Sequence, residues 1–261
     1  MKSVIDHKNI AIANGKAAFT ALVLALSSSA FGQADQEVKA FTLDGEFGFI
    51  VTTGNTETTS ISAGLAATQE LEKWSNSYNL SGLYKSDSVV NDDGEDEDQT
   101  TAQKFFASAQ GNYKLANPNY RLFGFGSYED DRFSNFDFQG TLAAGWNHLL
   151  WDNATSSFEY SVGPGYSYAK TLEDETINGV ILRGAVAYNW NISETAKFTQ
   201  TVATEIGEDN TKSRAESALT AQIYGGLSMK LSLKVDHNTD VAEGIDKLDT
   251  ETAMTLVYTF F

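Results

Sequence analysis

LDTETAMTLVYTFF, residues 248–261, is the stretch that decides the fold. From position 252 to 260 the even positions are Thr, Met, Leu, Tyr and Phe, whereas the odd positions are Ala, Thr, Val and Thr. This period of two predicts a β-strand with one apolar face and one more polar face. An apolar edge strand without a partner invites aggregation. Pairing with the first strand of the chain, in a closed barrel, removes that edge.

The composition favours one large β-domain. The 261 residues include 21 Gly, 16 Phe and 11 Tyr but only 2 Pro, which suits many strands joined by tight turns. The sequence has no cysteine, so disulfides and cysteine-ligated metal sites are excluded.

Residues 1–34 are predicted to be a secretory signal peptide, which leaves 35–261 as the barrel domain. A leader with three lysines precedes the apolar run AAFTALVLAL at 17–26, about half the length that a membrane-crossing helix needs. Small residues provide a cleavage site after Ala34, and a second possible site follows Ala30. We therefore expect export through the periplasm with removal of the leader.

The charge of the chain is strongly negative. The full sequence has a net charge of −17, and removal of three lysines and one aspartate with the leader makes it −19. A chain this acidic is not expected to bind nucleic acid. No stretch of about twenty apolar residues follows the leader, so strands are the only route into a membrane.

Twelve strands can be traced along the rest of the chain. Their expected ranges are 42–53, 58–69, 74–85, 102–115, 120–129, 136–149, 155–169, 179–190, 195–207, 214–223, 227–238 and 252–260. This pattern predicts an all-β fold, an antiparallel up-and-down transmembrane β-barrel with both ends on the periplasmic side. Weak patterning at 120–129 and 214–223 leaves ten or fourteen strands open. Pro164, inside a strand, predicts a local irregularity.

The connections alternate between short turns and longer acidic loops, which is typical of outer-membrane barrels. The longest is a polar loop expected at 86–100. Aromatic residues near the two sets of connections predict two belts at the membrane interfaces, although aromatic residues also favour strands in general. The expected belts consist of Trp74, Tyr113, Tyr120, Trp146, Trp151 and Trp190 near the short turns, and Tyr84, Tyr128, Phe136, Tyr166 and Tyr168 near the long loops.

The inner face of the predicted barrel is charged but nearly balanced. Its expected basic residues are Lys85, Lys104, Lys114, Arg121, Arg183, Lys197, Arg214, Lys230 and Lys234. Its expected acidic residues are Asp44, Glu46, Glu129, Asp137, Glu159, Glu205, Glu216, Asp236, Asp249 and Glu251. We expect these charges to pair and to leave a narrow or plugged lumen. A small, porin-like diffusion channel is the alternative.

An acidic cluster in the loop at 86–100 is a candidate site for a divalent cation, Ca²⁺ or Mg²⁺. Hard cations take several carboxylate oxygens, although the spacing here does not fit an EF-hand and a solvated acidic surface is the alternative. The candidate ligands are Asp92, Asp93, Glu95, Asp96 and Asp98. No other cofactor is expected.

Catalysis is not expected, because the three histidines have no evident partners. His7 leaves with the signal peptide, His148 falls in the membrane-facing phase, and His237 follows Asp236 near a strand end. No serine can be tied to His148 by sequence, so an outer-membrane lipid hydrolase is a lower-ranked alternative.

Three motifs resemble the DUF481 family, which is described as YdiY-like, salt-induced outer membrane proteins. They are TGNTET at 53–58, YEDDRF at 128–133 and VYTF at 257–260. The resemblance covers about 42–260, with Phe261 and the acidic loop after Lys85 as departures. It implies an outer-membrane barrel associated with salt or osmotic stress, and it carries over no catalytic or ligand-binding residues.

The expected protein is therefore a monomeric outer-membrane barrel with acidic extracellular loops. Its expected partners are outer-membrane lipids and the barrel-insertion machinery, which would recognise the terminal strand with Tyr258 and Phe260. A soluble periplasmic β-protein is a third alternative.

Overall fold

The computed structural model describes residues 41–52, 58–90, 96–132, 134, 136–171, 175–208, 210–241 and 246–261. All of them belong to the second of the two units into which the chain divides, Glu37–Phe261. The predicted signal peptide lies outside the described residues and stays a prediction. Over the described ranges, no helix is long and apolar enough to cross a membrane.

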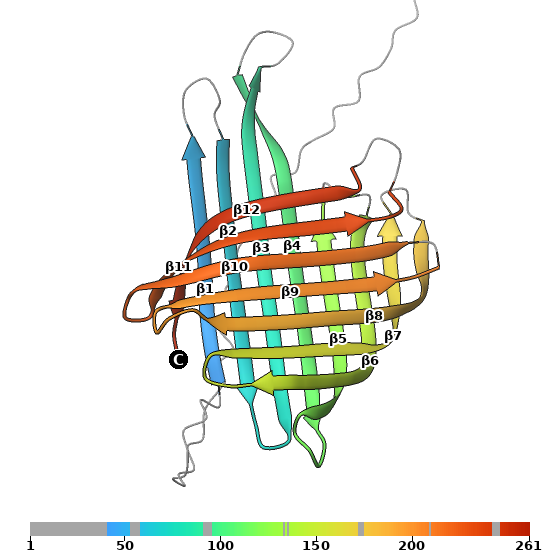
Figure 1. Ribbon diagram of the computed structural model, residues 1–261. Helices are drawn as coiled ribbons and strands as arrows, with labels where there is room; N and C mark the ends of the chain where they lie inside the picture. Colours follow the sequence, from blue (N-terminus) through green and yellow to red (C-terminus); the bar gives the residue numbers. More distant parts are fainter. Residues whose placement is uncertain are drawn as a thin grey trace, which may run out of the picture. The chain divides into compact units, whose positions relative to one another are not determined.

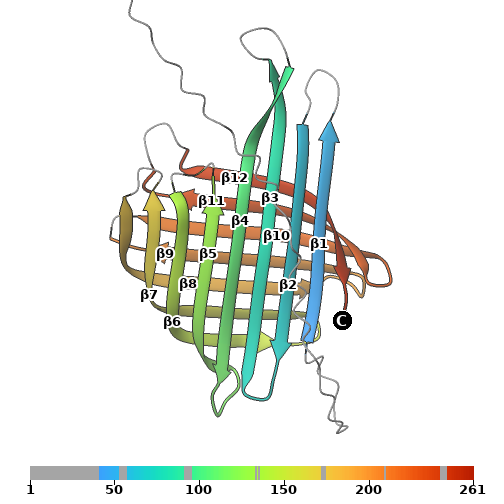
Figure 2. The same ribbon diagram turned by 180° about the vertical axis from the view of Figure 1, so that it is seen from behind.

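Twelve antiparallel strands form one closed barrel (Figures 1 and 2), as the sequence predicts. Each strand pairs with its neighbours in the chain, and the last pairs with the first. The strands are β1 (Phe41–Thr52), β2 (Thr58–Glu70), β3 (Trp74–Val90), β4 (Asp96–Lys114), β5 (Tyr120–Asp131), β6 (Phe136–Asp152), β7 (Ser156–Thr171), β8 (Thr176–Asn191), β9 (Ala196–Ile206), β10 (Thr211–Tyr224), β11 (Leu227–Asn238) and β12 (Leu248–Thr259).

The barrel closes where the sequence predicts, between β1 and β12. Asp44 lies opposite Thr259 and Phe47 lies opposite Leu256, and the backbone N–H of Phe260 donates to the carbonyl of Leu43 at 2.8 Å. Gly45 gives room for this contact, because a Cβ there would lie 2.9 Å from the Phe260 ring. The terminal strand therefore has partners on both sides, and both ends of the barrel chain lie at one rim.

The alternation along the strands separates an apolar outer surface from a polar interior. Leu142 of β6 is 70% exposed and Val180 of β8 is 73% exposed, whereas Thr141 and Ile181 next to them are buried. Large apolar side chains are exposed in this way on all twelve strands, among the residues that the structure describes. An apolar surface of this extent is suited to contact with lipid rather than water.

The long hairpin of β3 and β4 corrects the sequence prediction. A loop was expected at 86–100, but β3 continues to Val90 and β4 begins at Asp96, with Ser88 opposite Asp98. In Figure 1 this hairpin rises above the neighbouring strands. Both faces of this outer hairpin meet water, so its strands can pair through their backbones without an apolar face. The polar sequence therefore lacks the alternation from which a strand could be predicted.

Pro164 produces the irregularity that the sequence predicts. The pairing of β6 with β7 stops at Ala143 opposite Gly165 and resumes at Trp146 opposite Val162. Between these pairs the backbones approach so closely that a Cβ on Gly163 would lie 2.1 Å from the carbonyl oxygen of Ala144. Glycine is the residue that fits there, beside a proline that cannot donate to the ladder.

Aromatic side chains gather toward both rims. Near the short turns, the ring centroids of Trp74 and Tyr113 lie 5.2 Å apart. Near the long loops, the ring of Phe138 stacks between Tyr128 at 5.9 Å and Tyr168 at 5.7 Å. In this stack Phe138 takes the place expected for Phe136, because the register of β6 shifts between these two residues.

A charge on the outer surface should therefore destabilise the barrel according to its depth. We expect Leu142→Lys, near the middle of β6, to lower the free energy of unfolding by about 2–4 kcal/mol, because lipid cannot solvate the ammonium group. The control is Leu150→Lys on the same strand near the short-turn rim, expected to cost about 0–1 kcal/mol. Urea unfolding in lipid vesicles measures both, and equal losses would contradict a lipid-facing β6.

Candidate functional site

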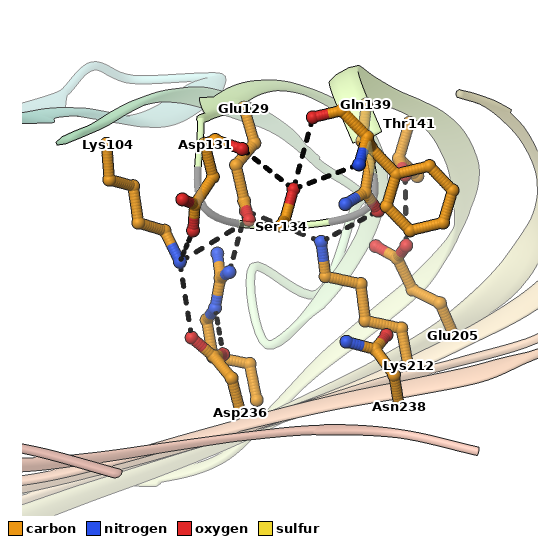
Figure 3. Close-up of polar contacts among 12 residues, drawn as sticks. Lys104, Glu129, Asp131, Ser134, Gln139, Thr141, Glu205, Lys212, Asp236 and Asn238 are labelled. Carbon is orange, nitrogen blue, oxygen red and sulfur yellow. Dashed lines mark hydrogen bonds and ion pairs between the residues drawn. The ribbon is translucent and has the colours of Figure 1, made fainter. Parts of the chain in front are cut away.

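The most buried carboxylate among the described residues of the lumen, that of Glu129 of β5, connects opposite walls of the barrel (Figure 3). Its side chain is 8% exposed and accepts a hydrogen bond from Arg214 Nη2 of β10 at 2.7 Å. Lys104 Nζ of β4 and Lys212 Nζ of β10 each lie 3.4 Å from its carboxylate. Because β5 and β10 are five strands apart in the ring of twelve, these contacts span the lumen.

Two further carboxylates complete the cluster. Arg214 Nε donates to Asp236 Oδ1 of β11 at 2.5 Å, and Lys104 Nζ lies 3.5 Å from Asp236 and 3.6 Å from Asp131. We call Lys104, Glu129, Asp131, Lys212, Arg214 and Asp236 the Glu129 network. Figure 3 shows Lys104 pointing between Asp131 and Asp236, while Lys212 points toward Gln139 and Glu129.

The charges of the Glu129 network cancel, since it contains three cations and three carboxylates. Charged groups taken out of water are costly unless they are paired and hydrogen-bonded, and charge-assisted hydrogen bonds are the strong ones. Glu129 can therefore be buried only because three cations contact its carboxylate and compensate the loss of water. The network also occupies the lumen toward the long-loop ends of β4, β5 and β10.

A second buried arginine, Arg183 of β8, lies deeper in the barrel. Its guanidinium carbon is 3.7 Å from the centroid of the Phe125 ring, and its Nε is 3.6 Å from Glu205 Oε1. The other oxygen of Glu205 accepts a hydrogen bond from Thr141 at 2.9 Å. Arg214 stacks in the same way, 4.8 Å above the ring of Phe106. Aromatic faces thus support both arginines by cation–π contacts.

Ion pairs also line the rest of the lumen. They are Arg121–Glu159 at 3.8 Å, Lys230–Glu46 at 3.1 Å, Lys230–Glu216 at 2.9 Å, Lys234–Glu251 at 3.5 Å and a close pair of Lys114 with Glu70. Most of these residues were predicted to face the lumen, and the prediction that lumen charges pair with one another agrees with these contacts.

Two members of the Glu129 network were missed from the sequence. Asp131 was assigned to an exposed loop, but β5 continues through it and its carboxylate faces Lys104. Lys212 was assigned to a loop before strand 214–223, but β10 begins at Thr211. The signal was available, because Lys212, Arg214 and Glu216 occupy alternate positions. The sequence also did not show that Phe125 of β5 faces the lumen, because β5 carries aromatic residues on both of its faces.

The predicted cation site is not tested by the structure. Asp92, Asp93 and Glu95 lie outside the described residues, as does the side chain of Asp96. Asp98 is exposed on β4 opposite Ser88. Over the described part of the chain, no group of three or more His, Cys, Asp or Glu side chains is arranged to hold a metal ion.

The two histidines among the described residues are not members of the Glu129 network. His148 Nδ1 is 3.3 Å from the hydroxyl of Tyr160, and the His148 ring centroid lies 4.7 Å from that of Tyr120. These contacts place His148 in an aromatic cluster near the short turns. His237 lies on β11 opposite Ser213 of β10.

Comparisons with known proteins agree with the fold. The sequence profile of DUF481, a protein family of unknown function, matches residues 45–260. The uncharacterized protein YdiY of Escherichia coli (strain K12) is 26% identical over 217 residues, which cover 81% of this chain and 80% of that protein. Among solved structures, the NanC porin superposes with a TM-score of 0.50 at 9% identity, over 84% of this chain and 100% of that chain. The COG4313 outer membrane channel from Pseudomonas putida F1 gives a TM-score of 0.47 at 9% identity, over 84% and 94% of the two chains. At this identity the likeness to NanC porin shows the barrel fold alone.

The contacts of Glu129 predict that its charge is essential to stability. Glu129→Gln should lower the free energy of unfolding by about 3–5 kcal/mol, because it leaves three cations together in the lumen without their shared carboxylate. The control is Glu251→Gln, whose pair with Lys234 is 37% and 34% exposed. We expect it to change stability by at most about 1 kcal/mol. The measurement is the temperature at which the folded, heat-modifiable gel band disappears. Equal shifts for the two variants would contradict the role of Glu129.

Proposed function

The chain belongs to the DUF481 family, and from that premise we propose that it is an outer-membrane barrel with a closed lumen that serves the envelope under salt or osmotic stress. The observation that carries the proposal is the Glu129 network, which joins β5 to β4, β10 and β11 inside the barrel. A protein built for free diffusion has no need of side chains that meet across its lumen.

The space left inside the barrel supports a closed lumen. Two cavities, of about 290 and 400 Å³, are both lined by Arg214 and Phe106. The guanidinium of Arg214 is held by Glu129 on one side and by Asp236 on the other. Opening a path past Arg214 would separate charges that are largely removed from water, which is energetically costly.

The outer surface supports a location in the outer membrane. The exposed apolar positions and the aromatic stacks at both rims suit a lipid bilayer. We propose that the signal peptide at 1–34 directs export, that the barrel-insertion machinery recognises the terminal strand, and that the barrel is a monomer surrounded by lipid.

The acidic side chains at the long-loop rim support the proposed role under salt stress. Glu97, Asp98, Glu175, Glu208, Asp240 and Asp246 are all exposed toward this rim. Carboxylates at this density attract hydrated cations, and salt at physiological concentration screens their mutual repulsion beyond about 8 Å. A surface of this kind stays hydrated as the salt concentration rises.

We propose a non-catalytic role. The contacts of His148 with Tyr120 and Tyr160 are those of an aromatic cluster at the membrane interface. An outer-membrane lipid hydrolase ranks lower, and loss of phospholipase activity in His148→Ala would support it.

A small diffusion channel is the second candidate function. The observation in its favour is that hydroxyl, amide and charged side chains contribute to the walls of the cavities of about 290 and 400 Å³, which is compatible with the passage of water and small solutes.

Recording of the purified protein in planar lipid bilayers separates the two functions. We expect the wild-type barrel to show no steady open conductance, because the Glu129 network obstructs it. The triple variant Glu129→Ala, Lys212→Ala, Arg214→Ala should show steady openings, because it removes the side chains that cross the lumen. Lys104 then remains beside both Asp131 and Asp236.

The control for this recording is Lys234→Ala with Glu251→Ala, which removes an ion pair outside the Glu129 network. This variant should stay closed. Steady wild-type conductance would establish the channel instead, and a closed triple variant would show that the Glu129 network is not what closes the barrel.

The acidic hairpin predicts weak binding of divalent cations. Titration of calcium into the purified barrel should release or absorb heat at millimolar concentration, because several carboxylates can share one cation. The variant that changes Asp92, Asp93, Asp96 and Asp98 to Asn and Glu95 to Gln should lose this heat. Absence of heat with the wild-type protein would remove the cation site.

A further inference from the structure

The cavity of about 290 Å³ lies in the lumen between two sets of ion pairs. Glu129, Lys212 and Arg214 line it from the Glu129 network, and Glu159, which pairs with Arg121, lines it toward the short turns. Between them the wall combines apolar residues, such as Phe106 and Phe125, with many hydroxyl and amide side chains. These include Ser108, Gln110, Ser127, Asn147, Ser161 and Thr201.

Two residues in this wall carry polar atoms without partners. Asn147 is 1% exposed, and its Oδ1 has no hydrogen-bond partner among the described residues. Arg183 is 6% exposed, and the same holds for its Nε and Nη1, although Nε lies 3.6 Å from Glu205. A buried polar group left unsatisfied is rare and calls for a partner from outside the chain. Its presence in two residues of one cavity wall points to a bound guest.

The unmet atoms define the chemistry of that guest. Arg183 needs hydrogen-bond acceptors, whereas Asn147 Oδ1 needs a donor. A carboxylate offers acceptors only, and an ammonium group offers donors only. A hydroxyl group can both donate and accept a hydrogen bond. It can therefore bind Arg183 and Asn147, and also the serine and threonine hydroxyls of the wall.

The charge and volume of the cavity narrow the choice further. Arg183, Lys212 and Arg214 balance Glu129, Glu159 and Glu205 in the wall, so the cavity has no net charge to attract an ion. At about 30 Å³ for each water molecule, the volume corresponds to roughly ten waters, which is the size of a small molecule with about as many non-hydrogen atoms.

We propose that this cavity is a binding site for a neutral, polyhydroxylated molecule of monosaccharide size, held by Arg183 and Asn147. The site goes beyond a closed barrel, since it requires only the lumen wall and is the same whether or not the barrel conducts. The Glu129 network covers it toward the long loops, so the guest would be held within the barrel.

Isothermal titration of the purified full-length barrel in detergent tests this site. The probes are glucose and sorbitol as neutral polyols, with glucuronate and choline as charged molecules of similar size. We expect saturable heat with a neutral probe and weaker or no heat with both charged probes. No saturable heat with glucose or sorbitol would overturn the site, since the cavity would then hold water only, and tighter binding of glucuronate would overturn the neutral class.

Two variants test whether Asn147 and Arg183 bind the neutral probe. Asn147→Leu keeps the volume and removes the acceptor, and Arg183→Met with Glu205→Gln removes the guanidinium without leaving its carboxylate unpaired. Each should weaken binding of the neutral probe by about tenfold, the value of one buried hydrogen bond. Lys234→Met, a lumen residue outside this cavity, should bind as the wild type does.

The folded state of each variant is checked by its heat-modifiable migration, so that loss of binding is not confused with loss of the barrel. Wild-type affinity in folded Asn147→Leu and in the folded Arg183→Met, Glu205→Gln variant would overturn the assignment. An unfolded Arg183→Met, Glu205→Gln variant leaves the decision to Asn147→Leu, which alters no charge.

Discussion

The structure depends on one constraint: a strand in hydrocarbon can satisfy its backbone N–H and C=O groups only with another strand. Closure of β12 onto β1 meets that constraint for the last edge of the sheet. It brings Asp44 opposite Thr259 and places the Phe260 ring over Gly45. Once the ring is closed, each strand residue within the membrane faces either lipid or lumen, and the alternation of apolar and polar side chains follows from this division.

Closure also determines what the charged residues do. Side chains that point inward from twelve strands meet one another in a space largely shielded from bulk water, so charges there are stabilised by partners on other strands. Glu129 finds its partners on β4 and β10, and Arg214 is shared between Glu129 and Asp236. The ion pairs that compensate these charges are the same contacts that cross the lumen. In the closed barrel that we propose, stability and closure therefore have a common origin.

The sequence predicted the strands best where lipid and lumen impose opposite demands on neighbouring positions. β2, β6, β11 and β12 alternate clearly. β2 and β11 lie where they were expected, whereas β6 ends three residues later and β12 begins four residues earlier than expected. The alternation is weaker in β5, where Phe123 and Phe125 face inward as supports for the interior, and in the outer part of β3 and β4, where both faces meet water. Prediction failed where the environments on the two sides of a strand resemble each other.

Contacts across the lumen could not be predicted from the sequence, because they depend on strand tilt and stagger. Alternation shows that Glu129 and Arg214 face inward, but not that they lie at the same height. Lys212 and Asp131 show the same limit, because β10 begins three residues before its expected start and β5 ends two residues after its expected end. The unmet atoms of Arg183 and Asn147 are likewise a property of packing, with no signal in the sequence.

The charges at the long-loop rim and those inside the barrel differ in how strongly dissolved salt screens them. Exposed carboxylates at the long-loop rim lie in water, where dissolved ions screen their repulsion. The Glu129 network lies inside the barrel, where screening is much weaker, so its contacts persist as the salt concentration changes. A barrel built in this way can adapt its surface to ionic strength while its lumen stays as it is. For the closed, salt-tolerant barrel that we propose, the burial of Glu129 is therefore as important as the acidity of the loops.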